Sequence, residues 1–235
     1  MQGYASDRST ARELLDSEEP SVRYRVLVGV LGRDPQGREA EIVRDEVRGS
    51  LRVKVLLAER DDDGRIPLQP YDKWRGAHWV MACLADLGYP AGDPSLVPLG
   101  EQVCEWLFSA KHQQSIRART KEGRTCWHAS MEGNALYYLQ VLGLAADRVG
   151  ELVQRLLEWQ WPDGGWNCDL RPQAATSSFM ESLIPLRGLA LHARLTGDPA
   201  SREAASRAAE VFLERDHNLL HRGLVHPTPP NVPRS

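Results

Sequence analysis

The chain has 235 residues, of which 42% are hydrophobic and 26% are charged, and its formal net charge is −3 at pH 7. This composition is typical of a soluble globular protein and supplies no basic surface for nucleic acid. No apolar run approaches the roughly 20 residues that a membrane span needs, and the N-terminus lacks the apolar core of a signal peptide. The cysteines, 4 in all, are too few for a disulfide scaffold, so we expect reduced thiols and a cytoplasmic protein.

Helical patterns follow one another along the chain, whereas strand patterns are nearly absent. The expected helices cover residues 21–31, 38–59, 73–87, 97–110, 130–144, 148–160, 177–195 and 201–215. Pro185 lies inside one of them and should kink or split it, because proline cannot donate the backbone hydrogen bond of a helix interior. Residues 224–235 are rich in proline and are expected to form an irregular tail.

The expected helices alternate between two kinds. Those starting at residues 38, 97, 148 and 201 are charged on one face, whereas those starting at residues 21, 73, 130 and 177 are apolar and rich in small residues. A helix that is polar on one face lies outside, and one that is apolar all round is buried. We therefore predict an all-α fold in a single domain, residues 1–235, with about four pairs of inner and outer helices repeating every ~50 residues.

One stretch is the most informative of the chain. Residues 160–166 read Q-W-P-D-G-G-W, and Asp163, Gly164 and Gly165 are turn-forming residues between the two tryptophans. Gln160, Gly164 and Trp166 match the Q-x-x-x-G-x-W motif that is repeated in squalene–hopene cyclases. The chain thus resembles the terpenoid cyclase and protein prenyltransferase superfamily. We expect the motif to act mainly as a clamp between an outer helix and the next inner one.

The resemblance implies an (α/α) toroid and a hydrophobic, isoprenoid-like small-molecule substrate in a central apolar cavity. Two departures qualify it. The D-x-D-D acid of the class II cyclases is absent, since Asp61, Asp62 and Asp63 lack that spacing and belong to a turn. About four helix pairs also fall short of the six or so in a complete toroid. The ring is therefore open, closed by fewer helices, or completed by a second chain, which leaves a homo-oligomer open.

The pocket of such a toroid opens at the N-terminal ends of the inner helices. Aromatic and polar residues gather there in the sequence, as expected for an apolar ligand site with a few polar anchors. The predicted substrate-binding residues are Tyr71, Trp74, His78, Trp79, Trp127, Asn134, Trp166, Ser178, Phe179 and Glu181. The alternative is that the aromatic residues simply fill wide gaps between helices.

Carbocation chemistry needs an acid, and the predicted catalytic residues are His128, Glu132 and Asp169. A buried carboxyl group could protonate an alkene, and the aromatic rings could stabilise the resulting cation. The alternative for Glu132 is a structural one: acidic residues favour the first turn of a helix, and Ser130 can cap that helix.

Cys126, His128 and Cys168 form a second constellation. Cysteine, histidine and aspartate are the zinc ligands of the protein prenyltransferases, so the resemblance implies a zinc ion there, and no other cofactor is expected. The alternative is that these cysteines are small buried hydrophobes. Two further functions stay open: a helical-repeat module without catalytic activity that binds a peptide or protein, and a zinc-dependent enzyme similar to the prenyltransferases.

Overall fold

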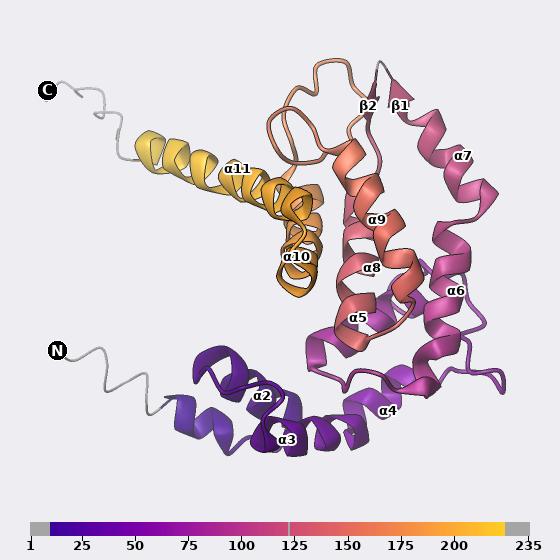
Figure 1. Cartoon of the computed structure of the whole chain (residues 1–235), viewed down its shortest axis with the longest axis vertical. Coiled ribbons are helices and arrows are strands. Elements are labelled where there is room, and N and C mark those ends of the chain that lie inside the picture. Colours follow the sequence, from indigo (N-terminus) through magenta and orange to yellow (C-terminus); the bar gives the residue numbers. More distant parts are fainter. Residues whose placement is uncertain (1–9, 122, 224–235) are drawn as a thin grey trace, which may run out of the picture.

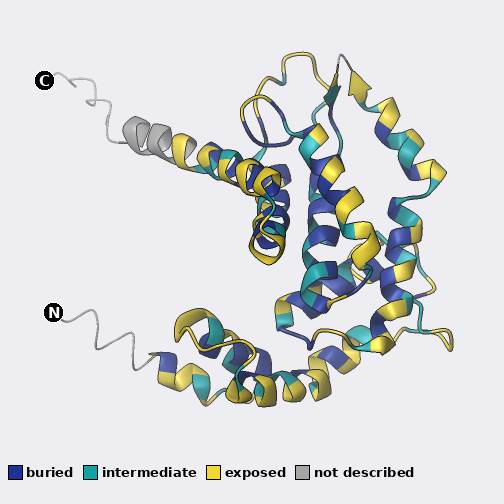
Figure 2. Cartoon of the chain, viewed as in Figure 1, coloured by how far each residue is buried: buried dark blue, intermediate teal, exposed yellow. Residues whose placement is uncertain are grey.

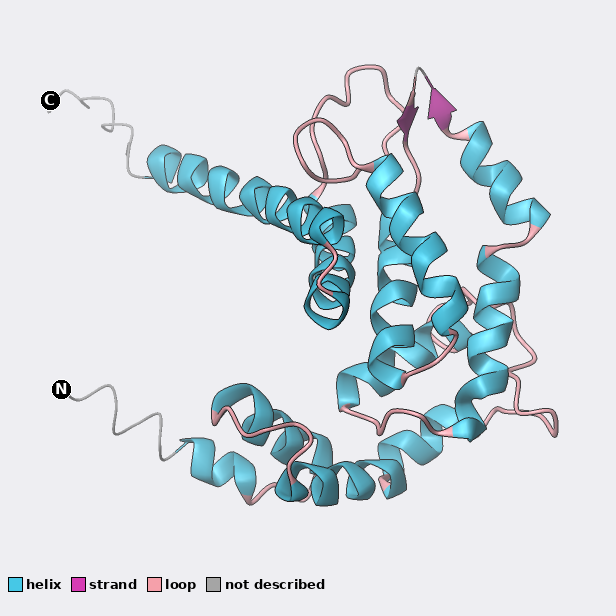
Figure 3. Cartoon of the chain, viewed as in Figure 1, coloured by secondary structure: helices cyan, strands magenta, loops and turns pink. Residues whose placement is uncertain are grey.

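The computed structural model describes residues 10–121 and 123–223, with side chains as far as residue 214, and almost all of its regular structure is helical (Figure 3). After a helical turn at residues 10–15, the elements are α2 (Pro20–Arg25), the π-helical η1 (Val26–Val30), α3 (Arg38–Gly49), α4 (Leu51–Leu57), α5 (Ala77–Leu87), the 3₁₀ turn η2 (Pro94–Leu96), α6 (Val97–Leu107), α7 (Ala110–Ala118), β1 (Thr120–Lys121), β2 (Arg124–Thr125), α8 (Ala129–Leu142), α9 (Ala146–Trp159), α10 (Phe179–Thr196) and α11 (Pro199–Gly223). The all-α prediction is confirmed, and the predicted tail at residues 224–235 lies outside the described residues.

The apolar helices lie next to one another in space. Helix α8 packs between α5 and α10, and the charged helices α6, α9 and α11 pack against α5, α8 and α10, respectively. Figure 1 shows the helices following an open arc from α2 and α3 to α10 and α11, and Figure 2 shows α5 and α8 as largely buried. In the described part of the chain, no helix combines the length and the apolar character that a bilayer span requires.

Helices α8 and α10 approach each other through two glycines. A Cβ atom at Gly133 would lie 2.6 Å from the nitrogen of Pro185, and one at Gly188 would lie 2.7 Å from the carbonyl oxygen of Gly133. Pro185 was expected to kink or split its helix, and the split is wrong, because α10 is continuous from Phe179 to Thr196. A proline inside a helix costs roughly 3 kcal/mol of stability. The close packing of the α10 backbone against α8 offsets this cost.

The sequence missed the helix ends at three places. The expected helix at residues 38–59 is interrupted at Ser50, which adopts an extended conformation and accepts a hydrogen bond from the backbone N–H of Val53. Helix α5 begins at Ala77 rather than residue 73, after Gly76 in an extended conformation. Ser109 caps a separate helix, α7, beyond the end of α6. The short antiparallel strands β1 and β2 follow α7 and form a hairpin. The apolar pattern missed these breaks because a single capping residue does not disturb it.

The stretch from Gln160 to Trp166 joins three helices. The side chain of Gln160 donates to the carbonyls of Gly164 and Ala204, and the indole N–H of Trp166 donates to the Leu156 carbonyl at 2.9 Å. The backbone N–H of Trp166 donates to the hydroxyl of Ser182 on α10. Trp166 is only 1% exposed, so it belongs to the core, and the ligand-binding role expected of it is corrected to a structural one.

Candidate functional site

A row of aromatic and imidazole rings lies at the N-terminal ends of α5 and α8. Neighbouring rings along it are in contact, with centroids 5.7 Å apart for Tyr71 and Trp106, 5.1 Å for Trp106 and His112, 5.2 Å for His112 and Trp127, and 5.7 Å for Trp127 and His128. Of these five residues, the sequence predicted Tyr71 and Trp127 as ligand-binding residues and His128 as a catalytic residue and zinc ligand. We call the five residues, together with His78 and Trp79, the ring row.

The ring row continues toward α5 and reaches the surface. His78 and Trp79 contact Tyr71 at 5.4 Å and 5.1 Å, and Trp74 lies against Trp79 at 4.4 Å. Trp74 is 67% exposed, whereas Tyr71, Trp79, Trp106, Trp127 and His128 are half-buried. The rings are thus accessible to a ligand along part of their surface, which distinguishes them from rings that only fill the core.

One end of the ring row carries a hydrogen-bonded acid–base pair. Nδ1 of His128 lies 2.9 Å from Oε1 of Glu181, and the backbone N–H of Ser130 donates to Oε2 of Glu181 at 3.0 Å. Burial acts to raise the pKa of Glu181, but the hydrogen bonds from His128 and Ser130 outweigh it and hold this pKa below its usual value. Glu181 therefore remains an anion beside His128, although its side chain is only 9% exposed.

Cys168 belongs to the same group. One ligand atom from each of His128, Cys168 and Glu181 lies within 4.8 Å of the other two. Burial, followed by the negative charge of Glu181, raises the pKa of Cys168 to about 11, and Arg119 donates to the Cys168 carbonyl at 3.4 Å. Two of the three predicted zinc ligands thus come together with Glu181, while Cys126 is buried outside the group.

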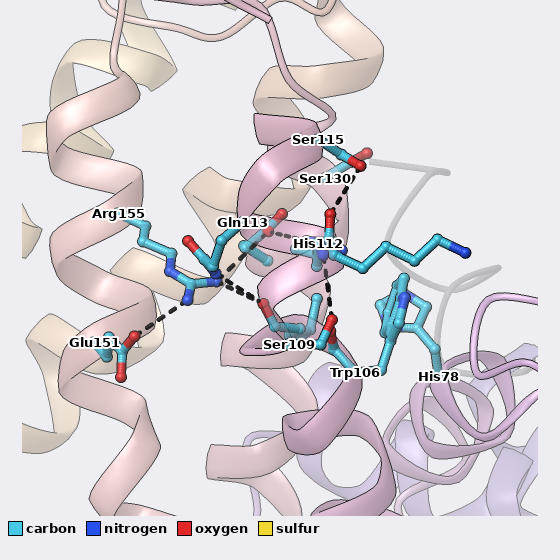
Figure 4. A network of polar contacts seen from close by, with 12 residues as sticks. His78, Trp106, Ser109, His112, Gln113, Ser115, Ser130, Glu151 and Arg155 are labelled. Carbon is cyan, nitrogen blue, oxygen red and sulfur yellow. Dashed lines mark hydrogen bonds and ion pairs between the residues drawn. The ribbon is translucent and has the colours of Figure 1, made fainter. Parts of the chain in front are cut away.

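Glu132 lies deeper, in a buried polar network that includes a residue the sequence did not single out. Its Oε1 lies 2.9 Å from Nε2 of His112 and 3.9 Å from a guanidinium nitrogen of Arg155. Figure 4 shows His112 beside Trp106 and Ser109, with Arg155 reaching in from α9. Among the described side chains, Oε2 of Glu132 and Nε1 of Trp127 are buried without a hydrogen-bond partner. Such atoms mark a place where a polar group of a ligand could be satisfied.

His78 is a buried histidine whose imidazole is neutral and contacts two polar side chains. Its Nδ1 lies 3.1 Å from the hydroxyl of Tyr138, and its Nε2 lies 3.5 Å from Nδ2 of Asn134. Burial, with a smaller contribution from His112, lowers the pKa of His78 to about 3.

The lowered pKa of His78 predicts a loss of stability in acid. Between an unfolded pKa of about 6.5 and the folded pKa, only the unfolded chain binds the proton, so the free energy of unfolding falls as the pH falls. We expect His78 to contribute a loss of about 3 kcal/mol between pH 7 and pH 4. Urea unfolding of the wild type and of His78→Gln at both pH values measures it. Equal losses in the two proteins would contradict this assignment.

Some predicted residues lie away from the ring row. The carboxylate of Asp169 pairs with Arg171 at 2.6 Å in the exposed loop before α10, and Phe179 stacks on Phe212 of α11 with centroids 5.0 Å apart. Ser178 caps α10, and its backbone N–H donates to the Trp166 carbonyl at 2.8 Å. The expected catalytic role of Asp169 and the expected ligand contacts of Ser178 and Phe179 are therefore not carried forward.

Trp106, His112 and Tyr138 belong to the site but were missed in the sequence. His112 falls just beyond the expected helix at residues 97–110, and Trp106 and Tyr138 are spaced like core residues of their helices. Ser109 was the available signal, because its hydroxyl accepts the backbone N–H of His112 and so starts α7.

Two surface pockets in the described part of the chain lie away from the ring row. One of about 550 Å³ is lined by residues of α6 and of the loop into α9, including Cys104, Phe108 and Arg148. An apolar groove of about 570 Å³ lies between α4 and α5, beside Leu51, Val55 and Leu87. The central apolar cavity expected from the sequence stays a prediction.

The chain matches no protein-family model, no curated protein and no solved structure.

Proposed function

We propose that the protein binds a hydrophobic, isoprenoid-like small molecule along the ring row and transforms it by acid–base chemistry at His128. The observation that carries the proposal is the continuous contact of rings from the exposed Trp74 to the hydrogen-bonded pair of His128 and Glu181. Most of the rings between them are half-buried, and His112 is buried. An apolar surface that ends at a few convergent polar groups is the usual composition of a ligand site.

The arrangement of helices supports the proposal by analogy. Inner helices α5, α8 and α10 with outer helices α6, α9 and α11 suit part of an (α/α) toroid similar to that of the terpenoid cyclases. In our proposal the ligand lies at the N-terminal ends of the inner helices. Fold analogy is a weak ground for function, so the site residues have to carry the argument.

His128 is the working acid and base in this proposal. Glu181 holds Nδ1, which fixes the orientation of the ring and leaves Nε2 for the ligand, as in other carboxylate–histidine pairs. The neighbouring rings stabilise a developing cation by about 0.5–2 kcal/mol each. Glu132 is fully buried and helps to position Trp127 through His112.

Farnesol is a suitable binding probe, and dodecanol of equal chain length is its matched straight-chain control. We expect farnesol to quench tryptophan fluorescence of the full chain and Trp74→Ala to weaken this binding about tenfold, because an exposed indole contributes on the order of 1–2 kcal/mol to such a contact. Leu213→Ala, which removes another exposed apolar side chain, should leave the affinity unchanged.

His128→Gln tests the chemistry separately. It should retain farnesol binding and lose conversion of any isoprenoid that the wild type transforms, as followed by mass spectrometry. The proposal is overturned if farnesol does not bind, if dodecanol binds as tightly, or if Trp74→Ala and Leu213→Ala behave alike. Conversion that survives His128→Gln would overturn the role of His128.

A further inference from the structure

We infer that His128, Cys168 and Glu181 form a zinc site with an open coordination position at the end of the ring row. The inference rests on the ligand surface of the proposed function and replaces direct proton transfer by His128 with metal chemistry at the same end of that surface. It differs from the sequence prediction in its ligands, since Glu181 takes the place of Cys126.

The donor set and its spacing fit zinc. Imidazole nitrogen, thiolate sulfur and carboxylate oxygen are the three ligand types that zinc prefers, and catalytic sites use three protein ligands. The three donor atoms lie within 4.8 Å of one another. Each comes from a different segment: His128 precedes α8, Cys168 lies in the loop after α9, and Glu181 lies in the first turn of α10. Only the folded chain assembles the group.

The surroundings hold the donors in place and balance the charge. The backbone N–H of Ser130 binds Oε2 of Glu181 and so leaves Oε1 toward His128. Arg119 fixes the loop by donating to the Cys168 carbonyl rather than to its sulfur. A thiolate and a carboxylate together neutralise a divalent cation, while the neutral imidazole adds the third ligand.

Such an ion would supply a Lewis acid, with a bound water as a stronger acid than free water. His128 and Glu181 would then hold the metal instead of exchanging protons themselves. The ring row would still bind the apolar part of the ligand, so the inference changes the chemistry at one end of the site only.

The test is metal binding by the full chain, purified without a metal-affinity tag and freed of metal by a chelator. After zinc is added back and unbound metal is removed by gel filtration, we expect about one zinc per chain by elemental analysis. We also expect cobalt, as a spectroscopic substitute, to give a thiolate-to-metal charge-transfer absorption. Cys168→Ser should abolish this absorption, and His128→Gln and Glu181→Gln should each weaken zinc binding at least about tenfold. Cys83→Ser and Cys126→Ala should keep both the absorption and the affinity.

Circular dichroism of each variant shows that a loss of metal is not a loss of fold. A zinc content near zero in the wild type overturns the inference, and so does a charge-transfer absorption that survives Cys168→Ser. Dependence on Cys126 in place of Glu181 would overturn the ligand set. Farnesol binding by the metal-free protein is measured independently, so a failure of the metal site and a failure of the proposed function are distinguishable.

Discussion

Trp166→Ala is expected to lower the free energy of unfolding by about 3–5 kcal/mol, the usual cost of removing a large buried aromatic side chain. The indole is 1% exposed, and it donates to the Leu156 carbonyl at the end of α9. Truncation leaves both a cavity and an unsatisfied carbonyl. The backbone of the same residue binds Ser182, so the cavity opens where α9, α10 and α11 meet.

Urea unfolding followed by far-UV circular dichroism measures the effect, and Trp74→Ala is the matched control. Trp74 is 67% exposed, so its truncation should change the free energy of unfolding by less than about 0.5 kcal/mol. A similar loss in both variants, or a loss below about 1 kcal/mol in Trp166→Ala, would show that the stretch from Gln160 to Trp166 does not hold these helices together.

The order of the helices could be predicted from the sequence because buried helices are apolar all round and surface helices are polar on one face. The apolar segments at residues 73–87 and 130–144 became α5 and α8, which lie side by side. The charged segment at residues 148–160 became α9, which packs against α8 with one face and is exposed on the other. The motif at Gln160 likewise had a local physical meaning. Turn-forming residues between two tryptophans within seven positions favour a tight turn that is packed against the neighbouring helices.

The breaks in the helices could not be predicted in this way. Ser50 ends α3 and caps α4, and Ser109 caps α7 just beyond the end of α6. An isolated serine is common inside helices as well. The continuity of α10 through Pro185 depends on Gly133 of another helix. That contact is a property of the packed structure and leaves no trace near Pro185 in the sequence.

The sequence predicted in part where the site residues lie, but it did not predict which side chains pair with one another there. Of the residues expected near the ends of the inner helices, Tyr71, Trp79, Trp127 and His128 lie in the ring row. Asp169 and Phe179 lie elsewhere. Which carboxylate contacts which imidazole depends on the packing of the helices that carry them. His112 binds Glu132, 20 residues away in the sequence, and His128 binds Glu181, 53 residues away. Local spacing favoured Cys126 as a neighbour of His128, but its side chain is buried outside the group.

His112→Ala is the second change with a large expected effect, a loss of about 3–5 kcal/mol in the free energy of unfolding. Glu132 is 0% exposed, and Nε2 of His112 is its nearest partner at 2.9 Å. Without His112, the remaining ionic partner of the carboxylate among the described side chains is Arg155, at 3.9 Å. The imidazole also contacts Trp106 and Trp127, so the variant loses packing on both sides as well.

A double-mutant cycle separates these contributions. His112→Leu combined with Glu132→Leu replaces both partners by apolar groups and should cost less than the sum of the single changes, with a coupling of about 0.5–3 kcal/mol. Additive losses would contradict a buried interaction between the two. Glu132→Gln keeps an acceptor for His112 and should be milder. If that variant folds normally and retains any conversion found in the wild type, Glu132 supports the ring row and is not the acid, which leaves the chemistry to the group around His128.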